Sequence, residues 1–107
     1  MRRGDLVTVA AHGDYGKPRP ALVIQADLFD TLSSVTLCLV TSTLLDAPVF
    51  RITVDPSPDN GLQRISQIEI DKITTVKRER VGRVIGRLDD ATMLKVNRSL
   101  AVFIGIA

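Results

Sequence analysis

The sequence predicts a mostly β fold, a small and mostly antiparallel barrel with one α-helix packed on it at the C-terminal end. Three observations predict this class. The chain contains about five to seven short β-branched or alternating segments, bounded by glycine, proline and polar residues. A single long helical pattern follows the last of these segments. No strand alternates with a helix as a parallel sheet requires, so neighbouring strands are expected to pair antiparallel.

Length and composition limit the organisation of the chain. It has 107 residues, the size of one ordinary domain, so residues 1–107 are expected to form a single unit. Hydrophobic residues make up 45% and charged residues 24%, a balance that excludes wholesale disorder. The only cysteine, Cys38, lies in an apolar run and is expected in the core, which excludes an internal disulfide and a multi-cysteine zinc site. No apolar run approaches the roughly 18 residues of a membrane span, and no signal peptide pattern is present, so we expect a cytoplasmic protein.

Each expected strand has its own local signal. The segments either are rich in β-branched and aliphatic residues or alternate apolar and polar residues, as one buried and one wet face require. A loop is expected at residues 11–18 and a turn-rich loop at 55–61, because both contain glycine and proline. A short helical turn is expected over 26–32. The predicted strands are residues 5–10, 19–25, 35–41, 50–54, 66–71 and 73–76.

The C-terminal segment carries the signals of an amphipathic helix. Asp89 is a good N-cap, and Asp90 suits the positive end of the helix dipole. The helix is expected to run to about residue 104 and to stop at Gly105. Apolar residues at spacings of three and four predict one stripe that packs on the core or on a second copy. They are Met93, Val96, Leu100 and Phe103.

The net charge is only +2, but its distribution is uneven. Between Lys72 and Arg87 there are six cations and one acid, Glu79, a local net charge of +5. This stretch either faces phosphates or is a solvated strand face. Aromatic residues are only 4%, so platforms that stack on nucleic-acid bases are poorly supplied. Any contact with nucleic acid is therefore expected to depend on charge and hydrogen bonds.

The sequence lacks the motifs of several enzyme classes. The sequence contains no phosphate-binding glycine loop, no dinucleotide fingerprint, no zinc-protease motif and no serine-hydrolase elbow. With one histidine, His12, a two-histidine mechanism cannot be built within one chain. Arginine beside Thr or Ser suits phosphate binding, because the guanidinium offers forked charged donors and the hydroxyl both donates and accepts. The polar candidates at strand ends and in loops are Asp14, Lys17, Arg19, Thr41, Ser42, Gln67, Glu69 and Asp71.

Short motifs follow one another in order along nearly the whole chain. They are Arg3-Gly4-Asp5-Leu6-Val7, Arg19-Pro20-Ala21-Leu22-Val23-Ile24-Gln25, Val40-Thr41-Ser42, Gly61-Leu62, Ser66 with Ile68-Glu69-Ile70-Asp71-Lys72-Ile73, and Val84-Ile85-Gly86-Arg87-Leu88-Asp89-Asp90. In this order they strongly resemble the MazF/PemK (Kid) family of toxins. The resemblance implies the CcdB/PemK-like fold, a small SH3-like antiparallel barrel with a C-terminal α-helix.

The resemblance also implies a function. Members of the family are the toxin components of toxin–antitoxin systems. They are sequence-specific, ribosome-independent endoribonucleases that cleave single-stranded mRNA without a metal or another cofactor. The implied reaction is attack by a ribose 2′-hydroxyl on the adjacent phosphorus, leaving a cyclic phosphate and a free 5′-hydroxyl. The implied partners are single-stranded RNA, a cognate antitoxin protein and a second copy in a homodimer, with no membrane.

Two residues carry the implied catalysis. Arg19 matches the family's catalytic arginine before proline, and Thr41 matches its catalytic threonine in the Thr-Ser step. Arg19 is expected to stabilise the charge that builds on the nonbridging phosphate oxygens, and Thr41 to fix the phosphate or the nucleophile.

The implied substrate-binding set is larger. Asp14 falls where the family usually has Glu, and Asp71 falls at an acidic position that some members use near the scissile phosphate. The general base stays open among His12, Asp14 and Asp71. Residues 13–18 depart from the family's usual loop, so cut-site specificity cannot be carried over. The complete expected substrate-binding set is Asp14, Lys17, Ser42, Gln67 and Asp71.

Two alternative functions stay open on the sequence. The first is a CcdB-like poison of DNA gyrase, because Gly105-Ile106 near the C-terminus resembles the tail of such proteins, although Ile104 stands where they have Trp. The second is a noncatalytic RNA-binding relative. The pair Arg19 and Thr41 favours the endoribonuclease over both.

Overall fold

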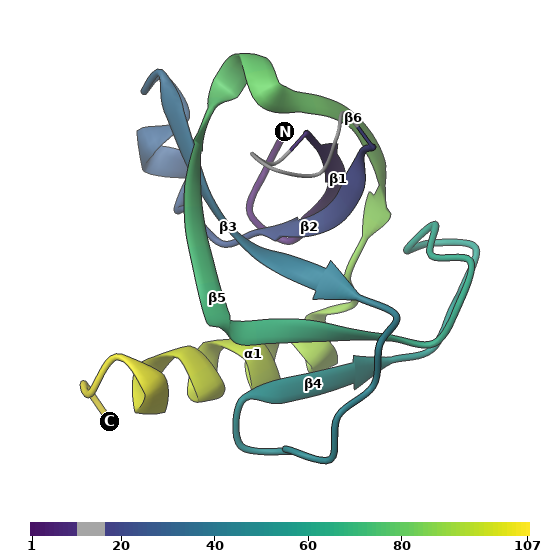
Figure 1. Ribbon diagram of the computed structural model, residues 1–107. Helices are drawn as coiled ribbons and strands as arrows, with labels where there is room; N and C mark the ends of the chain where they lie inside the picture. Colours follow the sequence, from purple (N-terminus) through teal and green to yellow (C-terminus); the bar gives the residue numbers. More distant parts are fainter. Residues whose placement is uncertain (11–16) are drawn as a thin grey trace.

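The computed structural model describes residues 1–10 and 17–107, which form one curved antiparallel sheet with a helix against it (Figure 1). The predicted class, mostly β with one C-terminal helix, is confirmed for these residues. Two short 3-10 turns are η1 (Asp27–Phe29) and η2 (Arg78–Arg80). The other elements are β1 (Asp5–Val9), β2 (Arg19–Val23), β3 (Ser34–Thr41), β4 (Arg51–Val54), β5 (Ser66–Lys77), β6 (Val81–Arg87) and α1 (Asp90–Phe103).

The six strands pair in the order β4-β5-β3-β2-β1-β6. The sequence predicted two strands at 66–71 and 73–76, and this prediction was wrong, since β5 is one continuous strand. It bends instead of breaking. Val40 pairs with Ile68 and Cys38 pairs with Ile73, so Leu39 alone faces residues 69–72. These extra residues let β5 turn the corner visible in Figure 1. Its first part pairs with β4 and with the end of β3, and its second part pairs with the first half of β3.

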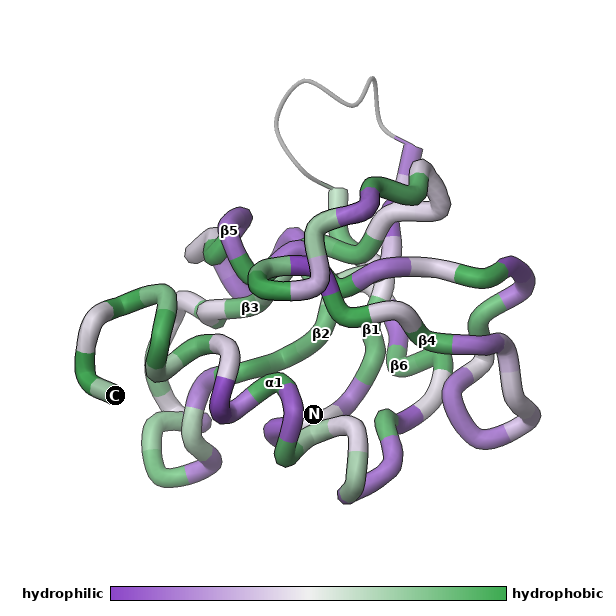
Figure 2. Tube along the Cα trace, turned by 90° about the horizontal axis from the view of Figure 1, so that it is seen from below, coloured by the Kyte–Doolittle hydropathy of each residue, from purple (hydrophilic) through white to green (hydrophobic). Residues whose placement is uncertain are grey.

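Strands β1, β2 and β3 are buried on both faces, which explains their nearly continuous apolar sequences. Leu6 and Leu22 point to one face, where they share a cluster with β4 and with Val96 of α1. Val7 points to the other face, where it shares a second cluster with Val76 of β5. In Figure 2, β2 is accordingly drawn largely in green, the hydrophobic end of the scale. The alternation within each strand thus fills two separate cores.

The loop between β4 and β5 closes the open side of the sheet against β6. The Arg87 N–H donates to the Asp59 carbonyl over 2.7 Å. Gly61 has φ 69°, and a Cβ there would lie 2.0 Å from the Ile85 carbonyl oxygen. Only glycine allows this approach, because it has no Cβ and adopts positive φ readily. The closing loop is therefore fixed against β6 by backbone contacts.

The Arg3-Gly4-Asp5 motif is structural. The Asp5 carboxylate accepts from the Arg87 side chain over 2.9 Å and from the Arg2 N–H over 2.7 Å. Arg3 donates to the Ile24 carbonyl and to Asn97 on α1, both over 2.8 Å. The motif therefore joins the N-terminus to β6 and to the helix.

Helix α1 begins and ends where the sequence predicts. Asp89 is the N-cap, and its carboxylate accepts from the N–H and the hydroxyl of Thr92. Val96 is fully buried, while Met93 and Leu100 pack on the core from its edge. Phe103, the last residue of the predicted stripe, is 50% exposed, so the core of one copy does not cover it. In the described part of the chain, no helix is long and apolar enough to cross a membrane.

Candidate functional site

A groove of about 330 Å³ lies between the start of β2, the end of β3, the closing loop and β6. Arg19, Thr41 and Ser42 all line it. The sequence therefore selected three side chains that the fold brings to one place.

The strand register explains why Arg19 and Thr41 meet. In the β2–β3 ladder Ala21 pairs with Leu39. Extending this antiparallel register by two residues places Arg19 opposite Thr41, and the period of two puts both on the same face as Ala21 and Leu39. Pro20 sits beside Arg19 near the strand start, where a missing N–H is tolerated.

The hydroxyl end of the groove lies where β3 stops. Thr41 is half-buried, and its Oγ1 accepts from the Thr43 N–H over 3.1 Å. This bond holds the side chain in one position and leaves its O–H to donate elsewhere. Ser42 is exposed beside it. Both are placed to contact an anion on the surface of the groove.

Two further arginines line the groove. They are Arg64 from the closing loop and Arg83 from β6, both exposed. Among the lining residues that the structure describes, three are arginines and none is acidic. The sequence analysis did not select Arg64, which follows an ordinary turn and has no local motif; Arg83 appeared only as a member of the basic stretch.

The basic stretch from Lys72 to Arg87 does not gather at the groove. Arg87 is paired with Asp5, and Arg78 donates through Nε to the Leu32 carbonyl over 2.9 Å. Arg83 alone of the six cations lines the groove. The high local charge in the sequence is distributed in space because the stretch passes through β5, η2 and β6.

Gln67 pairs with Thr41 in the β3–β5 ladder, but it is only 6% exposed and is not among the residues that line the groove. Its Oε1 accepts from the Leu45 N–H over 2.9 Å, and its Nε2 donates to the Leu45 carbonyl over 3.0 Å and to Thr53 over 3.2 Å. Both ends of the amide are thus used to hold the chain that follows β3. The structure therefore gives Gln67 a supporting position beside Thr41, outside the groove lining.

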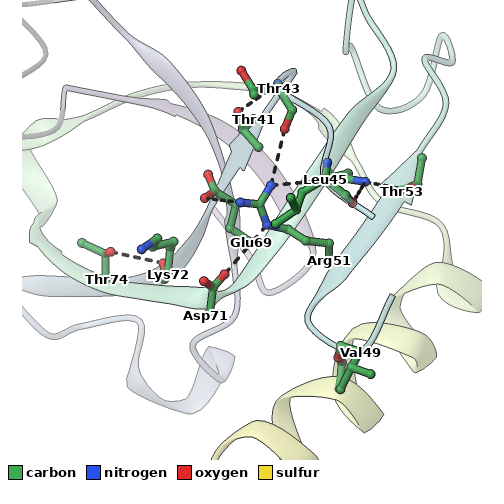
Figure 3. A network of polar contacts seen from close by, with 12 residues as sticks. Thr41, Thr43, Leu45, Val49, Arg51, Thr53, Glu69, Asp71, Lys72 and Thr74 are labelled. Atoms are coloured by element: carbon green, nitrogen blue, oxygen red, sulfur yellow. Dashed lines mark hydrogen bonds and ion pairs between the residues drawn. The ribbon is translucent and has the colours of Figure 1, made fainter. Parts of the chain in front are cut away.

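Asp71 also lies outside the groove lining. Figure 3 shows it beside Arg51, with Glu69 on the same guanidinium. Arg51 Nε is 4.0 Å from the Asp71 carboxylate, and Arg51 Nη2 is 3.5 Å from that of Glu69. Arg51 also donates to the Thr43 carbonyl over 3.4 Å. This cluster, Arg51, Glu69 and Asp71, supports the segment that leaves Thr41.

Three expected residues remain, His12, Asp14 and Lys17. Asp14 and the base candidate His12 lie within residues 11–16, outside the described residues. Lys17 is exposed and is not part of the groove lining, although its neighbour Pro18 is.

Cys38 is fully buried in the core, as the sequence predicts. Burial, with a contribution from the Asp71 charge, raises the pKa of the Cys38 thiol to about 12, so it stays protonated and is a poor nucleophile. Over residues 1–10 and 17–107, no three side chains of His, Cys, Asp or Glu gather in a group that could hold a metal ion.

The family model for PemK-like, MazF-like toxins of type II toxin–antitoxin systems matches residues 2–104. The chain is 49% identical over 108 residues to the probable endoribonuclease MazF of Mycolicibacterium smegmatis, covering 100% of this chain and 99% of that protein. A solved structure of a mycobacterial endoribonuclease with its cognate antitoxin matches at a TM-score of 0.85 and 23% identity, covering 100% of this chain and 97% of the matched chain. A MazE–MazF structure from Deinococcus radiodurans matches at a TM-score of 0.81 and 22% identity, covering 100% of this chain and 97% of the matched chain. The chain therefore belongs to the family of PemK-like, MazF-like toxins of type II toxin–antitoxin systems.

Proposed function

We propose that this toxin is an endoribonuclease that cleaves single-stranded RNA in the groove lined by Arg19 and Thr41. One observation carries the proposal: two side chains with phosphate-binding chemistry, from different strands, share a groove whose described lining has three arginines and no acid. The name of the mycolicibacterial relative supports the same activity.

The reaction is a transesterification that balances without a cofactor. The ribose 2′-oxygen attacks the adjacent phosphorus, the bond from phosphorus to the 5′-oxygen breaks, and the products are a cyclic phosphate and a 5′-hydroxyl. The 2′-hydroxyl proton passes to a base, and the 5′-oxygen takes a proton as it leaves. Arg19 would stabilise the charge on the nonbridging oxygens, and the Thr41 hydroxyl would hold the phosphate or the nucleophile. DNA is excluded because it lacks the 2′-hydroxyl.

The base must reach the 2′-hydroxyl within hydrogen-bond distance. Asp71 faces Arg51 and lies outside the groove lining. His12 and Asp14 therefore become the stronger candidates. The pH–rate profiles of three separate variants, His12→Ala, Asp14→Asn and Asp71→Asn, identify the base. Loss of the base should remove the acidic limb of the pH–rate profile.

The decisive experiment needs only pure protein, RNA and EDTA, without ribosomes or gyrase. Discrete fragments with cyclic phosphate ends are expected from single strands, and duplex RNA should resist because a paired strand cannot easily reach in-line geometry. Activity that EDTA removes and magnesium restores would refute the metal-independent reaction. RNA binding without cleavage would instead favour the noncatalytic alternative.

The gyrase-poison alternative has its own control. The tail residues Gly105, Ile106 and Ala107 lie beyond the helix and are exposed. Deleting them should leave RNA cleavage and toxicity intact. Toxicity that survives Arg19→Ala and disappears on this truncation would establish the alternative.

We also propose that the toxin is a homodimer inhibited by an acidic antitoxin segment laid over the arginine-lined groove. Val102, Phe103 and Ile104 are each at least half exposed, and a second copy would bury them. Light scattering at micromolar concentration tests the dimer, which a monomeric mass would overturn. Inhibition by an acidic, partly disordered antitoxin tests the second part. The mycobacterial endoribonuclease solved with its cognate antitoxin supports the binding of an antitoxin to this fold.

A further inference from the structure

We infer that Arg64 and Arg83 bind the RNA phosphates on either side of the bond that is cut, so that the groove holds a run of single strand rather than one phosphate. The inference rests on the proposed function. It adds two substrate-binding residues and a path for the RNA that follows the order of the strands, from the closing loop past Thr41 on β3 and Arg19 on β2 to Arg83 on β6.

Arg83 reaches the groove because β6 carries a bulge. Val7 pairs with Val84 and Val9 pairs with Val81, so Thr8 alone faces both Gly82 and Arg83. A bulge of this kind re-aims a side chain and is common beside functional sites. Thr8 also lines the groove, so the bulge forms part of its wall.

The bulge is fixed by a specific contact. The Arg83 N–H donates to the Thr8 hydroxyl over 3.1 Å. A Cβ on Gly82 would lie 2.4 Å from the same oxygen, so a larger residue there would displace the Thr8 hydroxyl from this contact. The sequence around Arg83 is thus adapted to this geometry, which a merely solvated arginine does not need.

Arg64 is held in a comparable way on the closing loop. Its carbonyl accepts from the hydroxyl of Ser66, which is 5% exposed, over 2.9 Å. Two residues earlier, the Leu62 N–H donates to Asn60 Oδ1 over 3.0 Å. The backbone is therefore anchored on both sides of Arg64, while its side chain is exposed at the groove.

The apolar floor of the groove and its arginines are suited to binding single-stranded RNA. Leu62 is buried and Ile85 half-buried, and both line the groove, where they offer an apolar surface to a ribose or a base. No aromatic ring occurs among the lining residues that the structure describes, so binding there depends on charge. Three arginines on three elements exceed what one phosphate requires and fit neighbouring phosphates of one chain.

The test measures the binding of a labelled single-stranded oligonucleotide with 2′-O-methyl groups at every position, which has no 2′-hydroxyl and cannot be cut. Its affinity is measured at several salt concentrations. For single strands each phosphate contact contributes about 0.7 to the slope of log affinity against log salt. Arg64→Gln and Arg83→Gln are each expected to reduce the slope by about 0.7, and Arg83→Lys to retain it. Arg2→Gln, an exposed arginine outside the groove, is the matched control and should leave the slope unchanged.

The outcomes separate this inference from the proposed function. An unchanged slope in both groove variants, with unchanged thermal unfolding, would overturn the inference, as would an equal reduction in Arg2→Gln. A second arm uses unmodified RNA. Failure of the unaltered toxin to cut that RNA would overturn the proposed function, whatever the slopes are.

Discussion

At the scale of single residues, the side chains expected to contact RNA differ in burial from the side chains that support the fold around the groove. Arg19 is exposed at a strand start, whereas Gln67 is buried and hydrogen-bonded at both ends of its amide. Exposed residues contribute little to folding, and buried polar residues contribute through their partners. Activity and stability are therefore expected to respond to different substitutions.

Arg19→Ala is expected to lower RNA cleavage by about 10²- to 10³-fold, because one donor to the transition-state charge is lost. Its free energy of unfolding should stay within about 0.5 kcal/mol of the unaltered toxin, as is usual for an exposed residue. Thr41→Val, nearly the same shape without the hydroxyl, should reduce cleavage more mildly. Cleavage rates and chemical denaturation measure the two effects.

Leu22→Ala on the same strand as Arg19 is the control. Leu22 is fully buried, so its truncation should lower the free energy of unfolding by about 2 to 5 kcal/mol. The fraction that remains folded should cleave RNA at the normal rate. Equal loss of stability in Arg19→Ala would mean that Arg19 supports the fold.

At the scale of elements, the bent strand β5 depends on the cluster of Arg51, Glu69 and Asp71. Both carboxylates come from the bend, and the guanidinium comes from β4. Arg51 and Glu69 are 13% and 14% exposed, and Asp71 is 28% exposed. One cation therefore stabilises two partly buried carboxylates at the point where β5 turns.

Arg51→Met is expected to destabilise the toxin by about 1 to 3 kcal/mol, because it leaves two neighbouring carboxylates without a cation and partly out of water. Adding Glu69→Gln and Asp71→Asn should recover part of the loss. Urea denaturation compares the variants. No recovery in the triple variant would contradict the charge explanation and assign the loss to the hydrogen bonds of Arg51 with the Thr43 carbonyl and Gln67 Oε1 or to the packing of its stem.

The helix cap predicts a pH dependence. Bonds from the Thr92 hydroxyl and N–H lower the pKa of Asp89, so the folded state binds its proton less readily than the unfolded chain. The cap's contribution is therefore complete above the unfolded pKa of about 3.9 and is lost as pH falls through the lower folded pKa. At pH 7, Asp89→Ala should cost about 1 kcal/mol.

The measurement is thermal unfolding of the toxin and its variants between acid and neutral pH. The difference between unaltered toxin and Asp89→Ala should shrink as pH falls below about 4. Asp89→Asn is the control, since Asn also caps a helix but does not titrate. A difference that persists at low pH would argue against the charged cap.

At the scale of the whole molecule, the closing loop is what turns an open sheet into a molecule with a groove. Gly61 and Gly86 let the loop and β6 approach so closely that a Cβ on either would meet backbone within 2.5 Å. The same contact sets the distance between Arg64 on the loop and Arg83 on β6. The contact that closes the sheet therefore also fixes the geometry of the groove.

Gly61→Ala is expected to destabilise the toxin by about 1 to 2 kcal/mol for positive φ and about 1 to 3 kcal/mol more for the clash with Ile85. Gly105→Ala is the matched control, because Gly105 has φ 82° with nothing within 4 Å of the added Cβ. It should show only the smaller loss. Equal melting temperatures for the two variants would contradict a closure set by this contact.

The sequence by itself determined most of the elements. Strand alternation, the Asp89 cap and the apolar run around Cys38 are local signals, and the structure confirms the helix, the first four predicted strands and the burial of Cys38. One continuous strand, β5, replaces two predicted strands, and β6 was not predicted. The sequence also selected Arg19, Thr41 and Ser42, which the groove brings together. Their catalytic and binding roles remain predictions.

Only the tertiary structure decided which other polar residues join them. Gln67 and Asp71 lie on a strand whose bend is set by pairing with β3 and β4, so their surroundings depend on residues far away in the sequence. Arg64 reaches the groove through loop closure, and Arg83 reaches it through a bulge opposite Thr8. Local patterns determine which face of a strand a side chain occupies, whereas long-range pairing determines what that face meets.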